Sequence, residues 1–419
     1  MMQNEINPQS VKVAAAALAG NFVCSAPIVT ASFGAFLIPV TEEFGWARSS
    51  FAFVLTLVSL IGVVMLPFAG RVADRFGVRR VVLAGNILFA ASVALLAFGG
   101  ARLVDFYILY ILVAVASAFS STVLLSRVVS EWFSDARGLF LGLTAGIGNG
   151  MGCAVMPILA LMVIGDHGWR AAYVALGAAV LVIGFPALWI GLREKPARSG
   201  GRSVETAAMP GVGAREARRT GLFWAILIAI AVGGGALSAV FTHVVPLLND
   251  RGLEDASMLV ISCIAISSTI FQIALGRILD KTALPRFAAL LILMSAAGVA
   301  ILSQANTTEG LVIAAILVGI GNGAEYALLS YIVPRYFGLH SYSEVYGSIL
   351  GVVLLCMGTT PMLMDVVYDL HGNYDPSLAG IVVALIVTSL IVLRFPSYRY
   401  ARDGEAVSDA KPIGQILTA

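Results

Sequence analysis

The chain has 419 residues, of which 59% are hydrophobic and 12% charged, and its mean hydropathy is +0.93. Soluble globular proteins carry about 25% charged residues, so this composition excludes a soluble enzyme of two or three domains. The 26 basic and 24 acidic residues nearly balance, which gives no basic excess that would suggest a nucleic-acid partner. The four cysteines stand far apart in apolar runs, a spacing that predicts neither a disulfide framework nor a metal site.

Twelve long apolar stretches follow one another along the chain, each close to the roughly 20 residues that a helix needs to cross a bilayer. They cover 13–41, 49–70, 81–101, 106–126, 138–165, 171–192, 220–249, 256–276, 287–308, 310–334, 345–364 and 376–393. Only the tenth contains a charged residue, Glu325. The first, at 29 residues, is too long for a signal-peptide core, so we expect it to remain as the first helix. The pattern predicts an all-α integral membrane protein.

Basic residues are distributed unevenly between alternate loops. If the N-terminus lies in the cytoplasm, 22 of the 26 basic residues fall on that side, which predicts that both termini are cytoplasmic. The longest polar stretch between spans, 193–219, is rich in Gly, Ala and Arg and is expected to be a flexible or surface-lying cytoplasmic linker. The predicted domains are an N-terminal six-helix bundle, a linker, a C-terminal six-helix bundle and a cytoplasmic tail, at 1–192, 193–219, 220–395 and 396–419.

A short charged motif follows both the second and the eighth predicted helix, at a spacing of 206 residues. The first copy contains Gly70, Asp74, Arg75, Gly77 and Arg79, and the second contains Gly276, Asp280 and Lys281. Glycine allows close backbone approach, and aspartate can cap a helix or pair with arginine. Because charge pairs between two halves can form in one conformation and break in another, we predict that this motif gates the cytoplasmic side.

The first copy, G-x-x-x-D-R-x-G-x-R-R, resembles the signature of the major facilitator superfamily. The resemblance implies the major facilitator fold, with 12 transmembrane helices in two six-helix bundles around a central cavity and movement by alternating access. In that family, helices one, four, seven and ten line the cavity. Short local stretches at 44–49, 168–170, 336–338 and 346–347 are similar to the bacterial monocarboxylate transporter and oxalate/formate antiporter group. This resemblance implies a monomeric symporter in the cell inner membrane that moves a small organic anion together with protons.

Two positions depart from that group. Monocarboxylate transporters resemble one another in an acidic residue and an arginine on helix eight, where alignment on Gly276 places Ser268 and Gln272. The membrane-embedded lysine of helix one is also missing, because no basic residue lies between Lys12 and Arg48. Either the anion site is built differently, or the substrate is more weakly charged, larger or aromatic.

Two ionisable residues inside the predicted spans are candidates for proton coupling, since such residues are costly in a bilayer. Glu325 is the first choice; the alternative is a structural partner for a helix end or for Arg127. His243, three residues before Pro246, is the second. Its alternative is a neutral imidazole bonded to a backbone carbonyl that the proline leaves free.

Neutral polar side chains and one arginine are the candidate substrate ligands. The neutral set comprises Asn21, Thr30, Asn149, Gln272, Asn322 and Tyr326. Each can instead bond a neighbouring helix. Arg127, at the inner end of helix four, either attracts an anion or anchors the helix at the membrane surface.

Glycines of the fifth span, which include Gly146, Gly148 and Gly150, predict close helix approach. A dinucleotide site is excluded because no strand precedes them, and the chain has no P-loop. We expect no cofactor, metal or enzymatic activity. Two alternatives remain: efflux of drugs or other hydrophobic compounds, which a neutral cavity would suit, and a transporter-like receptor without net flux.

Overall fold

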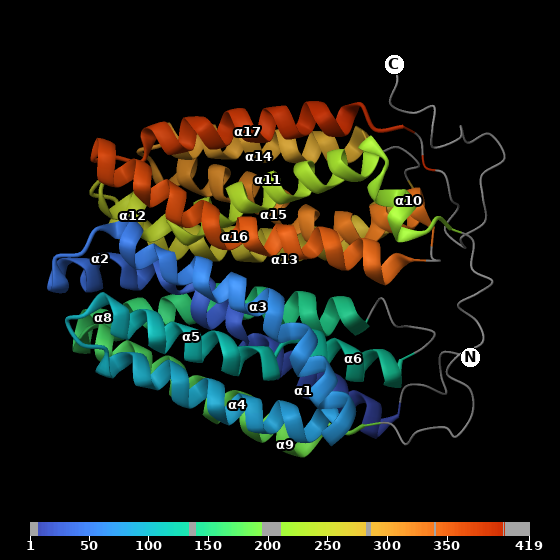
Figure 1. Ribbon diagram of the computed structural model, residues 1–419. Coiled ribbons are helices and arrows are strands. Elements are labelled where there is room, and N and C mark those ends of the chain that lie inside the picture. The colour runs from blue at the N-terminus through green and yellow to red at the C-terminus, as the bar shows by residue number, and fades with distance from the viewer. Residues whose placement is uncertain are drawn as a thin grey trace.

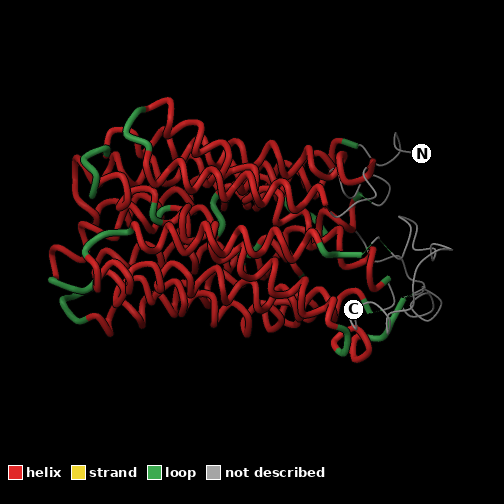
Figure 2. The backbone as a smooth tube through the Cα atoms, turned by 90° about the horizontal axis from the view of Figure 1, so that it is seen from above, coloured by secondary structure: helices red, strands yellow, loops and turns green. Residues whose placement is uncertain are grey.

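The computed structural model describes residues 7–133, 140–194, 211–281, 286–338, 341–396 and residue 398. Helices make up nearly all of this part of the chain, and they lie side by side along one direction (Figure 1). An antiparallel bridge between Gly211 and Gly338 joins the segment that precedes α10 to the end of α15. Loops gather at the two ends of the helices (Figure 2).

Proline and glycine divide the helices of the first half into segments. These segments include three π-helical turns, a backbone form that is often found at functional sites. They are α1 (Pro8–Phe22), a π-helical turn (Ala26–Ala31), α2 (Phe33–Phe44), α3 (Arg48–Phe76), α4 (Val78–Leu95), α5 (Leu103–Phe119), α6 (Thr122–Trp132), a π-helical turn (Gly142–Ile147), α8 (Gly148–Ala179), a π-helical turn (Val180–Gly184) and α9 (Phe185–Gly191).

The second half repeats the succession of long apolar helices after a short helix near the linker. Its helices are α10 (Ala214–Arg218), α11 (Gly221–Thr242), α12 (Val244–Asn249), α13 (Ser257–Lys281), α14 (Arg286–Gln304), α15 (Thr308–Phe337), α16 (Tyr342–His371) and α17 (Asp375–Leu393). α10 falls in the predicted linker and contacts α11 and α16. Arg218 of α10 forms an ion pair with Glu344 of α16 at 2.9 Å, so this last part of the linker lies against the second half.

Ten helical stretches in the described chain are long and apolar enough to cross a membrane. One of them, Gly142–Gly191, contains two predicted spans, because Gly168 adopts φ 81° and breaks the helix between them. The tenth predicted span lies on α15, which runs from Thr308 to Phe337 and includes the apolar segment Thr308–Ala324. The described part of each of the twelve predicted stretches therefore lies mainly on helices, as the all-α prediction requires.

The two halves pack separately and then meet. Each of four buried hydrophobic clusters draws its residues from one half only. The halves contact each other through α3 with α16, α8 with α13, and α2 with α12 (Figure 1). We call the end where α1 begins and α17 ends the terminal end, and the opposite end, where α3 begins and α16 ends, the distal end.

The eleventh span is longer than the sequence predicts. The apolar stretch was expected to end at residue 364 because Asp365 follows it, but α16 continues to His371 and ends at Gly372, which adopts φ 76°. Asp365 is fully buried inside this helix. The expectation that Glu325 is the one charged residue within a span is therefore wrong.

Candidate functional site: a neutral cavity closed by a charged seam

Two adjoining cavities lie between the halves. The Asn149 cavity, of about 100 Å³, is lined by residues of the first π-helical turn, the second π-helical turn, α8, α11, α13, α15 and α16. The Thr122 cavity, of about 270 Å³, lies toward α3, α5 and α6. Both are lined by Ala26, Thr30, Ser238 and Met357. The resemblance implies that helices one, four, seven and ten of the family line the cavity. Residues of α3, α8, α13 and α16, which do not belong to those four helices, line the two cavities as well.

The polar lining is made of amides, hydroxyls and thiols. Four of the predicted substrate ligands line the Asn149 cavity: Thr30, Asn149, Gln272 and Asn322. Ser268, which aligns with a charged position of monocarboxylate transporters, lies there too and accepts a hydrogen bond from the Asn322 amide at 3.4 Å. Among the described residues that line the two cavities, none is charged.

Two cysteines flank Asn149. The thiols of Cys24 and Cys153 lie 3.7 and 3.8 Å from its amide oxygen, and the Thr122 hydroxyl donates to the Cys24 sulfur at 3.6 Å. All four cysteines are free thiols. The amide oxygen of Asn149 therefore contacts one side chain from the first predicted span, Cys24, and one from its own helix, Cys153.

Close approach of neighbouring helices is confirmed at Gly148 and Gly150 of the fifth span, whereas a Cβ atom at Gly146 would make only ordinary contacts. A Cβ atom at Gly150 would collide with the Thr269 hydroxyl of α13, and one at Gly148 would lie 2.6 Å from the Leu18 carbonyl oxygen of α1. The interface between α8 and α13 therefore requires glycine at the positions that border the cavity.

The remaining predicted ligands lie elsewhere or outside the described side chains. Asn21 is fully buried and donates to the Ala17 carbonyl at 2.9 Å, a bond within its own helix. The side chains of Glu325 and Tyr326 lie outside the described residues, although both positions belong to α15. Arg127 forms ion pairs with Asp74 at 2.5 Å and with Glu131 at 3.4 Å, and it lines neither cavity.

The first copy of the gating motif links helices of the first half to one another. Asp74 near the end of α3 pairs with Arg127 of α6, and Gly77, at φ 89°, separates α3 from α4. The Arg79 guanidinium donates to the Trp189 carbonyl at 2.8 Å, while its backbone N–H donates to Glu194 at 2.7 Å. Gly70 and Arg75 lie on α3. In the second copy, at Gly276, Asp280 and Lys281, the side chains lie outside the described residues.

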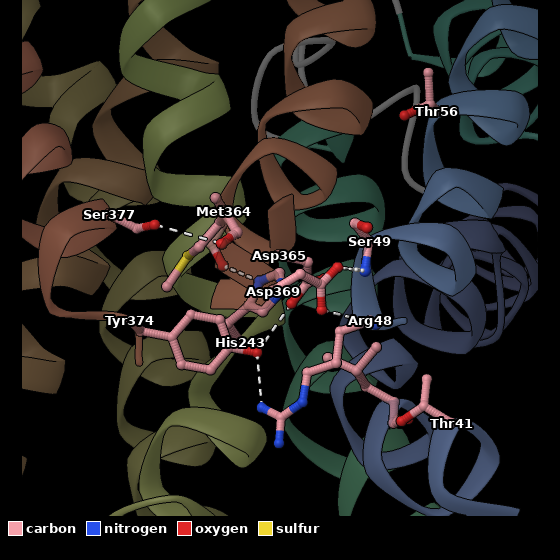
Figure 3. Close-up of polar contacts among 12 residues, drawn as sticks. Thr41, Arg48, Ser49, Thr56, His243, Met364, Asp365, Asp369, Tyr374 and Ser377 are labelled. Carbon is pink, nitrogen blue, oxygen red and sulfur yellow. Dashed lines mark hydrogen bonds and ion pairs between the residues drawn. The ribbon is translucent and has the colours of Figure 1, made fainter. Parts of the chain in front are cut away.

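A charged seam joins the halves at the distal end. The guanidinium of Arg48, at the start of α3, donates to both carboxylate oxygens of Asp250, at 2.8 and 2.9 Å. It also lies over the ring of Tyr368 at 3.9 Å. Asp369 of α16 accepts from the backbone N–H groups of Arg48 and Ser49, at 3.2 and 3.0 Å, and so caps α3 with a negative charge (Figure 3).

Behind the seam lies a buried histidine–aspartate pair. His243 separates α11 from α12, and its Nε2 atom lies 2.8 Å from Oδ2 of Asp365. Its Nδ1 atom lies 2.9 Å from the Ala239 carbonyl oxygen. The side chains are 1% and 0% exposed. The predicted contact of the His243 imidazole with a backbone carbonyl is therefore present. The same carbonyl, that of Ala239, also accepts the backbone N–H of His243. The second ring nitrogen faces the carboxyl group of Asp365.

Tyr374 connects the pair to the seam. Its hydroxyl donates to Oδ1 of Asp365 at 2.9 Å and accepts from Arg48 at 3.0 Å (Figure 3). Burial raises the pKa of Tyr374 well above its ordinary value, so this hydroxyl keeps its proton. The sequence interpretation missed Asp365 and Tyr374. Gly372, a helix-stop residue seven positions beyond Asp365, was the signal that could have placed the aspartate inside the helix.

The comparisons with known proteins agree with this architecture. A family model described as the Major Facilitator Superfamily matches residues 18–361. The chain belongs to the major facilitator superfamily. Monocarboxylate transporter 11 of Mus musculus is 24% identical over 92% of this chain and 87% of its own length. The 2-nitroimidazole transporter of Escherichia coli (strain K12) is 23% identical over 81% and 84%.

A solved structure shows the same fold. The crystal structure of nucleoside transporter NupG superposes with a TM-score of 0.74 at 14% identity, over 93% of this chain and 100% of that one. The family and the fold are those of membrane transporters, and the apolar helices make the chain a multi-pass membrane protein.

Proposed function

We propose that the chain moves a small organic acid across the cell inner membrane by alternating access, in symport with protons. The relative named monocarboxylate transporter 11, which matches along most of both chains, supports the substrate class. The terminal end faces the cytoplasm, an orientation supported by the 22 basic residues that fall on that side. In the conformation described above, the seam at Arg48 closes the end that then faces outward.

The neutral, hydrogen-bonding lining of the cavity carries the proposal. Thr30, Asn149 and Gln272 offer donors that suit a carboxyl group, while no described lining residue supplies a positive charge. An unpaired carboxylate is costly to bury, and a proton that travels with the acid removes this cost. The lining therefore favours transport of the acid and a proton together over transport of the bare anion.

Proton coupling is assigned first to Glu325 and second to His243. Both positions belong to the second half, on α15 and at the α11–α12 junction. Gating of the terminal end is assigned to the two motif copies, with Asp74 and Arg75 in one and Asp280 and Lys281 in the other. One chain is expected to suffice for transport, in contact with the lipid bilayer, because the cavity is built from the two halves of one chain.

A second candidate is the transport of an uncharged, hydrophobic compound such as an aromatic heterocycle. The same neutral lining supports it, as does the relative named 2-nitroimidazole transporter, which matches along most of both chains. An uncharged ligand would need no proton to enter the cavity, so the two candidates differ in their response to a proton gradient.

Uptake into proteoliposomes tests the proposal. The purified protein is supplied with labelled carboxylates and with uncharged analogues, with and without a proton gradient directed inward, and protein-free liposomes serve as the control. We expect carboxylates to accumulate only with the gradient and only with protein. Accumulation of uncharged compounds alone would overturn the organic-acid proposal. Glu325→Gln should abolish accumulation but retain exchange at equal concentrations; gradient-driven accumulation by this variant would remove Glu325 from the coupling role.

A further inference from the structure

The contacts of the buried His243–Asp365 pair fix how many protons it holds. The Ala239 carbonyl can only accept, so Nδ1 of His243 carries a hydrogen. Nε2 then lies 2.8 Å from Oδ2 of Asp365, a distance that requires a hydrogen between the two atoms. That hydrogen belongs either to an imidazolium beside a carboxylate or to a carboxylic acid beside a neutral imidazole. Both forms contain one proton more than a neutral histidine beside an ionised aspartate.

Loss of this proton would break one of the two imidazole contacts. The remaining ring hydrogen lies either on Nδ1, so that the Nε2 lone pair faces a carboxylate oxygen, or on Nε2, so that the Nδ1 lone pair faces the Ala239 carbonyl oxygen. In both tautomers Asp365 keeps a buried negative charge beside a neutral imidazole, with the Tyr374 hydroxyl as a further described donor. An uncompensated charge in a buried site is strongly disfavoured, so the unprotonated pair favours separation of its two side chains and entry of water.

Each member of the pair is attached to one anchor of the distal seam. His243 directly precedes the short helix α12, and Asp250, the partner of Arg48, directly follows that helix. Asp365 lies one helical turn before Asp369, which caps α3. Separation of His243 from Asp365 would therefore change the distance between the carboxylates of Asp250 and Asp369, and these two carboxylates contact the first half.

The groups that face the pair are few. Among the described residues, Tyr374 touches both members, through its hydroxyl to Asp365 and through its ring, 5.5 Å from the imidazole. Beyond Tyr374 lie the charged and titratable groups of the seam, contributed by α3, α12 and α16: Arg48, Asp250, Tyr368 and Asp369. Arg48 is the one cation among these groups. Its guanidinium is paired with Asp250, and its backbone N–H donates to Asp369.

We infer that the His243–Asp365 pair is a proton-binding site and that its proton-loaded form holds the distal end closed. The inference rests on the proposed proton coupling and locates a binding site at the distal end. A proton loaded while the distal end is open completes the contact, draws α12 and α16 together and presents Asp250 and Asp369 to α3.

A distance measurement between the halves tests this inference without any substrate. Spin labels are attached to cysteines at Ala101 and Asn306, exposed positions at the distal end of each half, in a protein whose four native cysteines are replaced by serine. The full chain in lipid nanodiscs is titrated from acidic to alkaline pH over the whole range in which the labelled protein stays folded. We expect the short-distance, closed population of the wild type to fall as the pH rises.

Asp365→Asn is the informative variant. The amide N–H replaces the shared proton by donating to Nε2 of a neutral imidazole, and the amide oxygen still accepts from Tyr374. This variant should stay closed across the pH range. His371→Gln is the matched control, since it removes an exposed histidine from the end of the same helix, and it should titrate like the wild type. A wild type that does not respond to pH, or an Asp365→Asn variant that responds as the wild type does, would overturn the inference.

Tyr374→Phe provides a second variant should Asp365→Asn fail to fold, as judged by gel filtration. It removes the hydroxyl between Asp365 and Arg48 and should reduce the amplitude of the pH response; an unchanged amplitude would contradict the link through this hydroxyl. The outcomes are separable from those of the uptake assay. A pH-dependent seam without carboxylate uptake would overturn the proposed substrate only, and carboxylate uptake with a seam insensitive to pH would overturn this inference only.

Discussion

Arg48 is the residue whose removal should most directly change the balance between the two ends of the transporter. Its side chain is 14% exposed, and that of its partner Asp250 is 24% exposed. The two form a bidentate pair across the seam, which Arg48 extends by contacts with Tyr368 and Tyr374. Arg48→Ala deletes all of these contacts in the closed conformation. It removes little from a distal-open conformation in which the halves are separated.

The size of the effect follows from burial of the pair. Truncation of one partner in a buried, hydrogen-bonded charge pair costs about 2–5 kcal/mol. Because both side chains keep some exposure to solvent, we take the lower part of that range, about 2–3 kcal/mol. A free-energy change of this size shifts the closed-to-open ratio by about 30- to 150-fold toward the open form.

The two-label distance measurement at Ala101 and Asn306 provides the assay, here at a fixed pH. Arg170→Ala is the matched control: Arg170 forms a pair with Glu43 at 2.7 Å near the same end, but both residues belong to the first half. Arg48→Ala should convert most molecules to the long distance, and Arg170→Ala should leave the distribution as in the wild type. If both variants give the wild-type distribution, Arg48 does not hold the seam and the reasoning fails.

Three further predictions concern the seam, the cavity and the gating motif. Gly34→Ala should also favour the distal-open form, by about tenfold or more, because the added Cβ would collide with the Thr242 carbonyl oxygen of the facing half; the same distance measurement checks it. Gln272→Ala should raise the KM of uptake about fivefold, the equivalent of one hydrogen bond, with unchanged yield of folded protein; an unchanged KM would remove Gln272 from the substrate site. Asp74→Asn should lower the rate of uptake several-fold with little change in KM, since Asp74 contacts Arg127 and lines neither cavity; a changed KM with an unchanged rate would argue against gating.

Much of the fold could be predicted because lipid imposes a simple rule on sequence. Apolar stretches of about 20 residues must form helices that satisfy their own backbone, so counting them predicted every long helix described above. The repeated motif and the polar linker predicted two halves. Thr30, Asn149, Gln272 and Asn322 were found because an amide or hydroxyl inside an apolar helix is uncommon, and all four line the cavity.

The distal network could not be predicted in the same way. A count that stops at the first charge places Asp365 outside the membrane, whereas the helix continues to Gly372 and buries it. Asp250, Asp369 and Tyr374 lie in or beside loops, and nothing in their local sequence shows that they meet Arg48 from another half of the chain. Such contacts between distant segments depend on how the halves dock.

Simultaneous measurement of both fluxes tests whether the acid and the proton move together. Proteoliposomes that contain a pH-sensitive dye are supplied with a transported, labelled acid, and internal acidification is recorded together with uptake, over a protein-free control. Because no described residue that lines the cavities is charged, we expect acidification to accompany uptake and an imposed membrane potential to leave the accumulation unchanged. Uptake without acidification, or accumulation that follows the membrane potential, would contradict this expectation.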